Sequence, residues 1–72
     1  MENRLSVAKH LTDEEYKYLL GTHAKHTGIM GLGERAEYDL SKIVKVERGN
    51  GCLHVHYSNG DWWHYTPSGA WY

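Results

Sequence analysis

The chain has 72 residues, and its 8 lysines and arginines nearly balance 9 aspartates and glutamates, for a formal net charge of −1. A chain of this length buries only about 60% of its unfolded surface, which leaves room for one core and little room for a deep substrate pocket. The near-zero charge excludes the strongly basic composition of proteins that follow a nucleic-acid backbone. The sequence therefore predicts one small domain over residues 1–72.

The chain contains a single cysteine, Cys52. One cysteine excludes an intramolecular disulfide, and small secreted domains usually carry several. No apolar run matches the core of a signal peptide or reaches the ~18 residues of a membrane span. We therefore expect a cytoplasmic protein that does not enter a membrane.

The N-terminal part combines an ambiguous stretch with a well-marked helix. Residues 1–10 alternate weakly and fit either an arm or a short added edge strand. Residues 12–27 predict a helix, because Thr12 suits the N-cap position and Glu15, three residues later, completes a capping box. Its expected buried side carries Tyr16, Leu19, Leu20, His23 and Ala24, which follow a helical spacing.

Residues 28–42 predict a flexible connection. Gly28, Gly31 and Gly33 interrupt any regular period, and the segment lacks the order of a phosphate-binding loop. Residues 34–40 fit a short second helix. Such a helix would either leave the sheet open or fold over its second face.

Residues 43–72 predict an antiparallel meander with strands near 43–48, 52–58 and 61–66. The pairs Asn50-Gly51 and Asn59-Gly60 are strong hairpin signals between alternating runs. Two-residue loops at both sites would pair Val46 with Val55 and Val44 with Tyr57 in the first hairpin. In the second hairpin they would pair Tyr57 with Trp62 and Val55 with His64. The expected fold class is α+β, with the helix packed on one face of a small three-stranded sheet.

This register sorts the strand residues onto two faces, because side chains alternate along a strand. The face expected under the helix carries Val44, Val46, Leu53, Val55, Tyr57 and Trp62. The opposite face is expected to carry Ile43, Lys45, Glu47, Cys52, His54, His56, Trp63 and Tyr65, with Trp71 brought opposite Tyr65 by the last turn.

Metal binding is one hypothesis for the second face. Cys52, His54 and His56 lie at alternate positions on one expected strand face, and His-x-His is a spacing that can hold zinc. Glu47 lies opposite His54 in the expected register and could be a further ligand. Ligands on a nearly flat face diverge, however, and His64 is expected on the other side of the sheet. Ordinary exposed strand residues are the favoured interpretation, and we expect no metal and no cofactor.

Catalysis is also not expected. Cys52 and His54 are neighbours that could act as nucleophile and base, but no third residue orients them and no group supplies an oxyanion site. We therefore expect a protein that is not an enzyme.

The second face is instead a candidate binding surface, with the expected residues His54, His56, Trp63, Tyr65, Trp71 and Lys45. Tryptophan and tyrosine dominate the hot spots of protein interfaces, and large exposed aromatic patches usually mark interaction. The leading hypothesis is an adaptor or inhibitor, of the kind that phages and mobile elements encode, that binds a larger protein or a second copy of itself. The alternative is single-stranded RNA stacked on the rings, which the low net charge disfavours.

Overall fold

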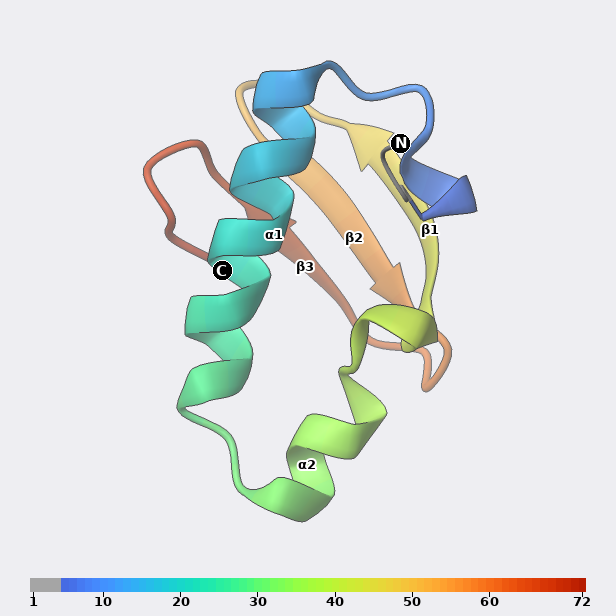
Figure 1. Ribbon diagram of the computed structural model, residues 1–72, viewed down its shortest axis with the longest axis vertical. Coiled ribbons are helices and arrows are strands. Elements are labelled where there is room, and N and C mark those ends of the chain that lie inside the picture. The colour runs from blue at the N-terminus through green and yellow to red at the C-terminus, as the bar shows by residue number, and fades with distance from the viewer. Residues whose placement is uncertain (1–4) are drawn as a thin grey trace.

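The computed structural model describes residues 5–72 as a three-stranded antiparallel sheet with one main helix packed on one face (Figure 1). The strands lie in the order β1, β2, β3. The elements in chain order are η1 (Ser6–Ala8), α1 (Asp13–Gly28), α2 (Leu32–Glu37), η2 (Leu40–Lys42), β1 (Ile43–Arg48), β2 (Leu53–Tyr57) and β3 (Trp62–Tyr65). The predicted α+β fold class is confirmed.

Helix α1 begins as the sequence predicts. The Glu15 backbone N–H donates to Thr12 Oγ1 at 3.1 Å, and the Thr12 N–H donates to Glu15 Oε1 at 2.8 Å. The same carboxylate accepts hydrogen bonds from Arg48 Nε at 2.8 Å and from its Nη2 at 2.7 Å. These Arg48 bonds are the main reason that the pKa of Glu15 falls to about 2. Glu15 thus joins the start of α1 to the end of β1.

The buried side of α1 differs from the expected one at its far end. Its buried residues are Tyr16, Leu19, Thr22, His23, His26 and Thr27, whereas Ala24 is exposed. His26 packs its ring 4.6 Å from Trp63 and stacks on Trp71 at 5.1 Å. Its Nδ1 lies 2.8 Å from the Tyr65 hydroxyl, which lies 2.6 Å from the Tyr57 hydroxyl. Burial raises the pKa of Tyr57 to about 12, so its hydroxyl stays protonated in this core network.

The enclosed His26 makes stability depend on pH. Burial, with a smaller contribution from neighbouring His23, lowers the pKa of His26 below its ordinary 6.5. The unfolded chain therefore takes up this proton more readily, so stability is complete above pH 6.5 and declines as pH falls through the lowered pKa. We expect the melting temperature to fall between about pH 7 and pH 5.

His26→Gln should flatten this decline in melting scans across that pH range. His10→Ala, at an exposed position outside the core, is the control and should keep the wild-type slope. Equal slopes in the wild type and His26→Gln would contradict the role given to His26.

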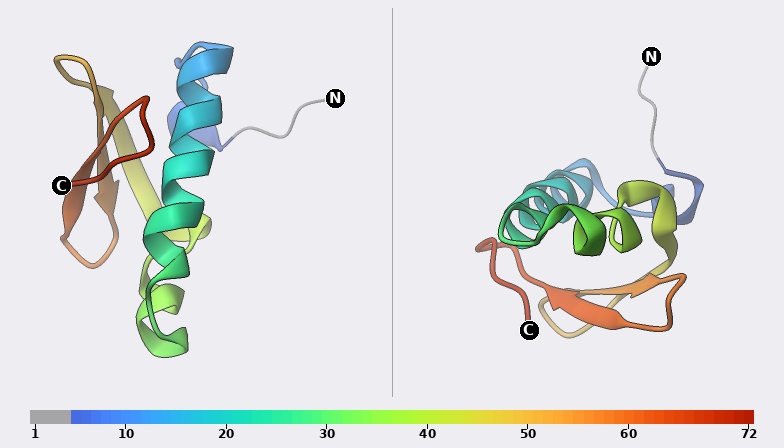
Figure 2. Two further views of the ribbon diagram at one scale, coloured as in Figure 1. Left: turned by 90° about the vertical axis from the view of Figure 1, so that its left-hand side faces the viewer. Right: turned by 90° about the horizontal axis from the view of Figure 1, so that it is seen from below.

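The segments before and after α1 were left open by the sequence. Residues 5–10, which fitted either an arm or an edge strand, form no strand, since η1 occupies 6–8 and packs beside β1; residues 1–4 lie outside the described part of the chain. The second helix α2 begins two residues before the expected position and lies on the same side of the sheet as α1 (Figure 2). It therefore does not cover the second sheet face. Among residues 5–72, no helix is long and apolar enough to span a membrane.

The first hairpin confirms the predicted pairing at its turn end and differs at the start of β1. Val46 pairs with Val55, as expected. An irregularity between Ile43 and Lys45 places Ile43, not Val44, opposite Tyr57. Ile43 is therefore buried, whereas Val44 is 53% exposed. The predicted core position of Val44 is wrong, because the extra residue of a bulge shifts the pairing so that Ile43 faces the core and Val44 faces outward.

The predicted register of the second hairpin is wrong by one residue. The Tyr57 N–H donates to Asp61 O at 2.8 Å and the Gly60 N–H donates to Tyr57 O at 3.0 Å, which closes a three-residue loop, not the expected two-residue loop. Gly60 has φ +94°, and among the described residues only glycines have positive φ. This is a type I turn with a glycine bulge, a common hairpin alternative. The resulting pairs are His56 with Trp62 and Val55 with Trp63.

This shift inverts the two faces of β3. Tyr65 is fully buried and Trp63 packs against the core, although both were expected on the open face. Trp62 was expected in the core and is 49% exposed. His64, also expected on the helix side, pairs directly with His54.

Candidate binding face

The sheet face that points away from α1 carries a continuous group of rings, which we call the open-face cluster. It comprises His54, His56, Trp62, His64 and Tyr72. Both helices lie on the opposite side of the sheet, and within residues 5–72 no helix covers these rings (Figure 2). The cluster is therefore the main aromatic surface that the described fold leaves uncovered.

The rings of the open-face cluster lie in mutual contact. His56 stacks on Trp62 with centroids 5.5 Å apart and planes 12° apart. Trp62 lies 4.9 Å from His64, which stacks on Tyr72 at 4.4 Å and 3°. His54 lies 4.7 Å from His64. Contacts of this kind hold the rings in place and give the surface a defined shape.

The C-terminal residues position Tyr72 beside the sheet. The His64 N–H donates to Tyr72 O at 3.0 Å, and the Tyr72 N–H donates to His64 O at 3.1 Å. The turn before them closes through Gly69, whose φ of +88° favours glycine. The last residues thus pair with the C-terminal half of β3 at its outer edge, through His64 and Tyr65.

Glu47 lies close to the two basic side chains beside the cluster. Lys45 Nζ lies 3.6 Å from Glu47 Oε2, and His56 Nε2 lies 3.4 Å from Glu47 Oε1. Arg48 points to the helix side, where it binds Glu15. A partner on this face would therefore contact aromatic and imidazole rings more than unpaired lysine or arginine side chains.

The predicted binding residues divide between the two faces. His54, His56 and Lys45 lie on the open face. Trp63, Tyr65 and Trp71 pack on the helix side against His26. Sequence reasoning did not place Trp62, His64 and Tyr72 on this face. A three-residue loop at 58–60, in place of the expected two-residue loop, would have placed them there.

The candidate metal ligands also change. Cys52, His54 and His64 place one ligand atom each within 4.8 Å of one another. His64 takes the place that the sequence gave to Glu47 and His56, which contact each other instead. Cys52 is buried and is a free thiol. Desolvation and the neighbouring Cys52 raise the pKa of Tyr72 above its ordinary value of 10.

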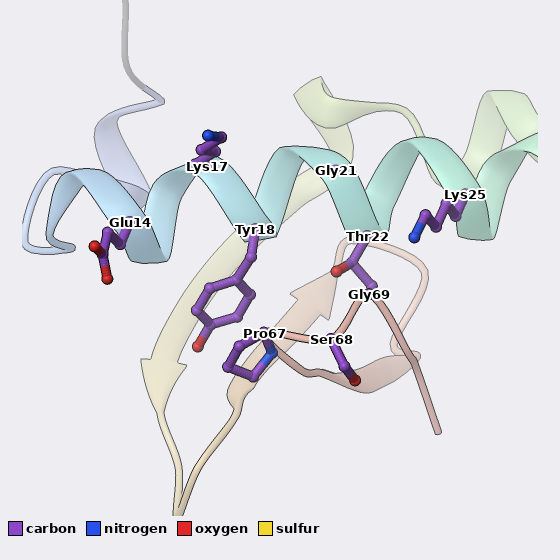
Figure 3. Close-up of a pocket in the computed structure, with 9 residues that line it drawn as sticks. All are labelled: Glu14, Lys17, Tyr18, Gly21, Thr22, Lys25, Pro67, Ser68 and Gly69. Atoms are coloured by element: carbon purple, nitrogen blue, oxygen red, sulfur yellow. The ribbon is translucent and has the colours of Figure 1, made fainter.

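A separate hollow of about 440 Å³ lies between α1 and the turn at 67–69 (Figure 3). Tyr18 and Lys25 reach from the helix toward this turn, whereas Lys17 points away from it. Thr22 anchors the turn by donating to Thr66 O at 3.3 Å. The charged side chains of the hollow, Glu14, Lys17 and Lys25, are exposed and of both signs, so we assign no ligand to it.

Comparison of the chain with protein-family models, with curated proteins and with solved structures finds no match.

Proposed function

We propose that this chain is a small adaptor or inhibitor without catalytic activity that binds a larger protein through its open-face cluster. The observation that carries the proposal is Trp62, which is 49% exposed and contacts His54, His56 and His64 at the centre of the cluster. Tryptophan on a preformed surface is the residue most enriched at interface hot spots. A cytoplasmic setting is part of the proposal, because Cys52 is a free thiol.

Charge favours a protein over single-stranded RNA as the partner. Stacking proteins for nucleic acid combine rings with cations that track the phosphates. Here Lys45 pairs with Glu47, and Arg48 is bound to Glu15 on the far side of the sheet. A protein surface of aromatic and aliphatic side chains fits this ring cluster better.

Trp62→Ala should leave the fold intact and weaken partner binding by at least about 2 kcal/mol, a roughly 30-fold loss of affinity. Tagged wild-type chain is used to capture partners from lysate of its source in chelator and with nuclease, and affinity is then measured with the purified partner. Leu32→Ala is the control, because Leu32 is 84% exposed on α2, on the opposite side of the sheet.

A partner retained by Leu32→Ala and lost by Trp62→Ala supports the proposal. Binding that disappears with nuclease favours the RNA alternative. Sedimentation that shows a dimer of wild-type chain and a Trp62→Ala monomer, without capture of another protein, would replace the larger partner by a second copy. A partner held equally by both variants would overturn the assignment of this face.

A further inference from the structure

The hairpin register places three metal-binding side chains at one corner of the sheet. Cys52 directly precedes β2, His54 lies in β2, and His64 lies opposite His54 in β3. Their ligand atoms lie within 4.8 Å of one another. In a tetrahedral zinc site with ordinary bond lengths such atoms are about 3.3–3.6 Å apart. Small side-chain rotations would close this difference without moving the strands.

Gly49 lets two of these side chains pack closely against the backbone. A Cβ atom at this position would lie 2.5 Å from His54 Nε2 and 2.9 Å from Cys52 Sγ. The φ of Gly49 is not among the positive values, which belong to Gly51, Gly60 and Gly69. Space, not backbone conformation, therefore demands glycine here. Glycine at this position therefore lets both ligand atoms lie close to the backbone, side by side.

His64 is oriented by Tyr72, which is not one of the three candidate ligands. Its Nδ1 lies 3.2 Å from the backbone carbonyl of Tyr72, which can only accept a hydrogen bond, so Nδ1 carries the proton. Nε2 then holds the free lone pair. Metal-binding histidines almost always donate their second N–H to such a carbonyl or carboxylate. The ring of Tyr72, stacked on His64 at 4.4 Å, restricts its rotation.

We propose that Cys52, His54 and His64 bind one zinc ion. A donor set of one thiolate and two imidazoles suits zinc better than calcium or magnesium, which prefer oxygen ligands. The Cys52 thiol loses its proton to solvent when the ion binds, since the thiolate is the ligand. Three protein ligands leave a fourth position, which water fills in the isolated chain.

This inference concerns the chain alone and does not depend on the partner. Chelator-treated wild-type chain is titrated with zinc chloride by calorimetry, and its melting temperature is followed. We expect one ion per chain, and at about 100 times Kd a rise of roughly 10–20 °C in melting temperature. Cobalt in place of zinc should give a thiolate charge-transfer band that Cys52→Ser abolishes.

Two variants test the ligands and the space. His64→Ala removes a partly exposed ligand and should weaken zinc binding at least about 100-fold. Gly49→Ala should fold, because the His54 ring can turn aside, and should weaken zinc binding by displacing that ring. His56→Ala is the matched control on the same face, and its affinity for zinc should equal that of the wild type.

The absence of binding by the wild type would overturn the inference, as would equal affinity of wild type and His64→Ala, or equal loss in His56→Ala. Because partner capture is done in chelator, failure of the zinc titration leaves the proposed protein interface standing. Zinc binding by a chain that captures no protein would contradict the proposed function alone.

Discussion

Val55→Asp is expected to unfold the protein. Val55 is fully buried at the centre of β2, between Val46 on β1 and Trp63 on β3. A carboxyl group there would have no partner in the apolar core formed by the described residues, and an uncompensated buried acidic side chain costs about 3–5 kcal/mol. That cost approaches the whole stability of a chain this size. Circular dichroism melting of the purified variant measures the effect.

Val44→Asp is the matched control. Val44 is 53% exposed where the bulge turns it outward, so the same chemical change should alter stability by no more than about 0.5 kcal/mol. A wild-type melting curve for Val55→Asp would contradict the observed core. Unfolding by both changes would contradict the bulge and restore Val44 to the buried face.

Tyr65→Ala should have the second largest effect, a loss of about 3–5 kcal/mol in the free energy of unfolding. The side chain is fully buried, and its hydroxyl lies between His26 Nδ1 and the Tyr57 hydroxyl at 2.8 and 2.6 Å. Truncation therefore removes a large ring and leaves two buried polar groups without their partner. Urea unfolding followed by tryptophan fluorescence gives the value.

Two further variants separate the ring from the hydroxyl and the two faces from each other. Tyr65→Phe keeps the ring and should cost only about 1–3 kcal/mol, the usual penalty for unpaired buried groups. Tyr72→Ala, at a residue that is 64% exposed, should cost far less than Tyr65→Ala. The reverse order for Tyr65 and Tyr72 would mean that β3 presents its other face to the core.

The helix start and the first turn could be predicted because each depends on a short, unambiguous pattern. Thr12 and Glu15 fulfil the capping box by themselves, and the turn after Arg48 leaves Val46 opposite Val55. These local rules need no knowledge of the rest of the chain. Burial of His26 could not be predicted in this way, because Trp63 and Trp71 enclose it from distant parts of the sequence.

The faces of β3 could not be predicted because the strand gives no alternation. Its four residues are Trp62, Trp63, His64 and Tyr65, so each face would receive rings in either register. The loop before it fits both a two-residue turn and a three-residue turn with a glycine bulge. The extra loop residue shifts the pairing of β3 so that His64 lies beside His54 and Cys52. The candidate metal ligands change for this reason. The bulge in β1 could not be predicted either. Ile43 and Val44 are both aliphatic, so each fits the buried position equally well.

The carboxylate of Glu15 also has a consequence for the order of folding. Its bond to Thr12 spans 3 residues, whereas its bonds to Arg48 span 33. Because a small loop closes at a lower entropic cost, we expect the short-range contact to form with the first turn of the helix, before the distant strand reaches the carboxylate. Part of the entropy of the long-range contact is thus lost early, at a local step. The helix start acts as a prepared docking point for the hairpin.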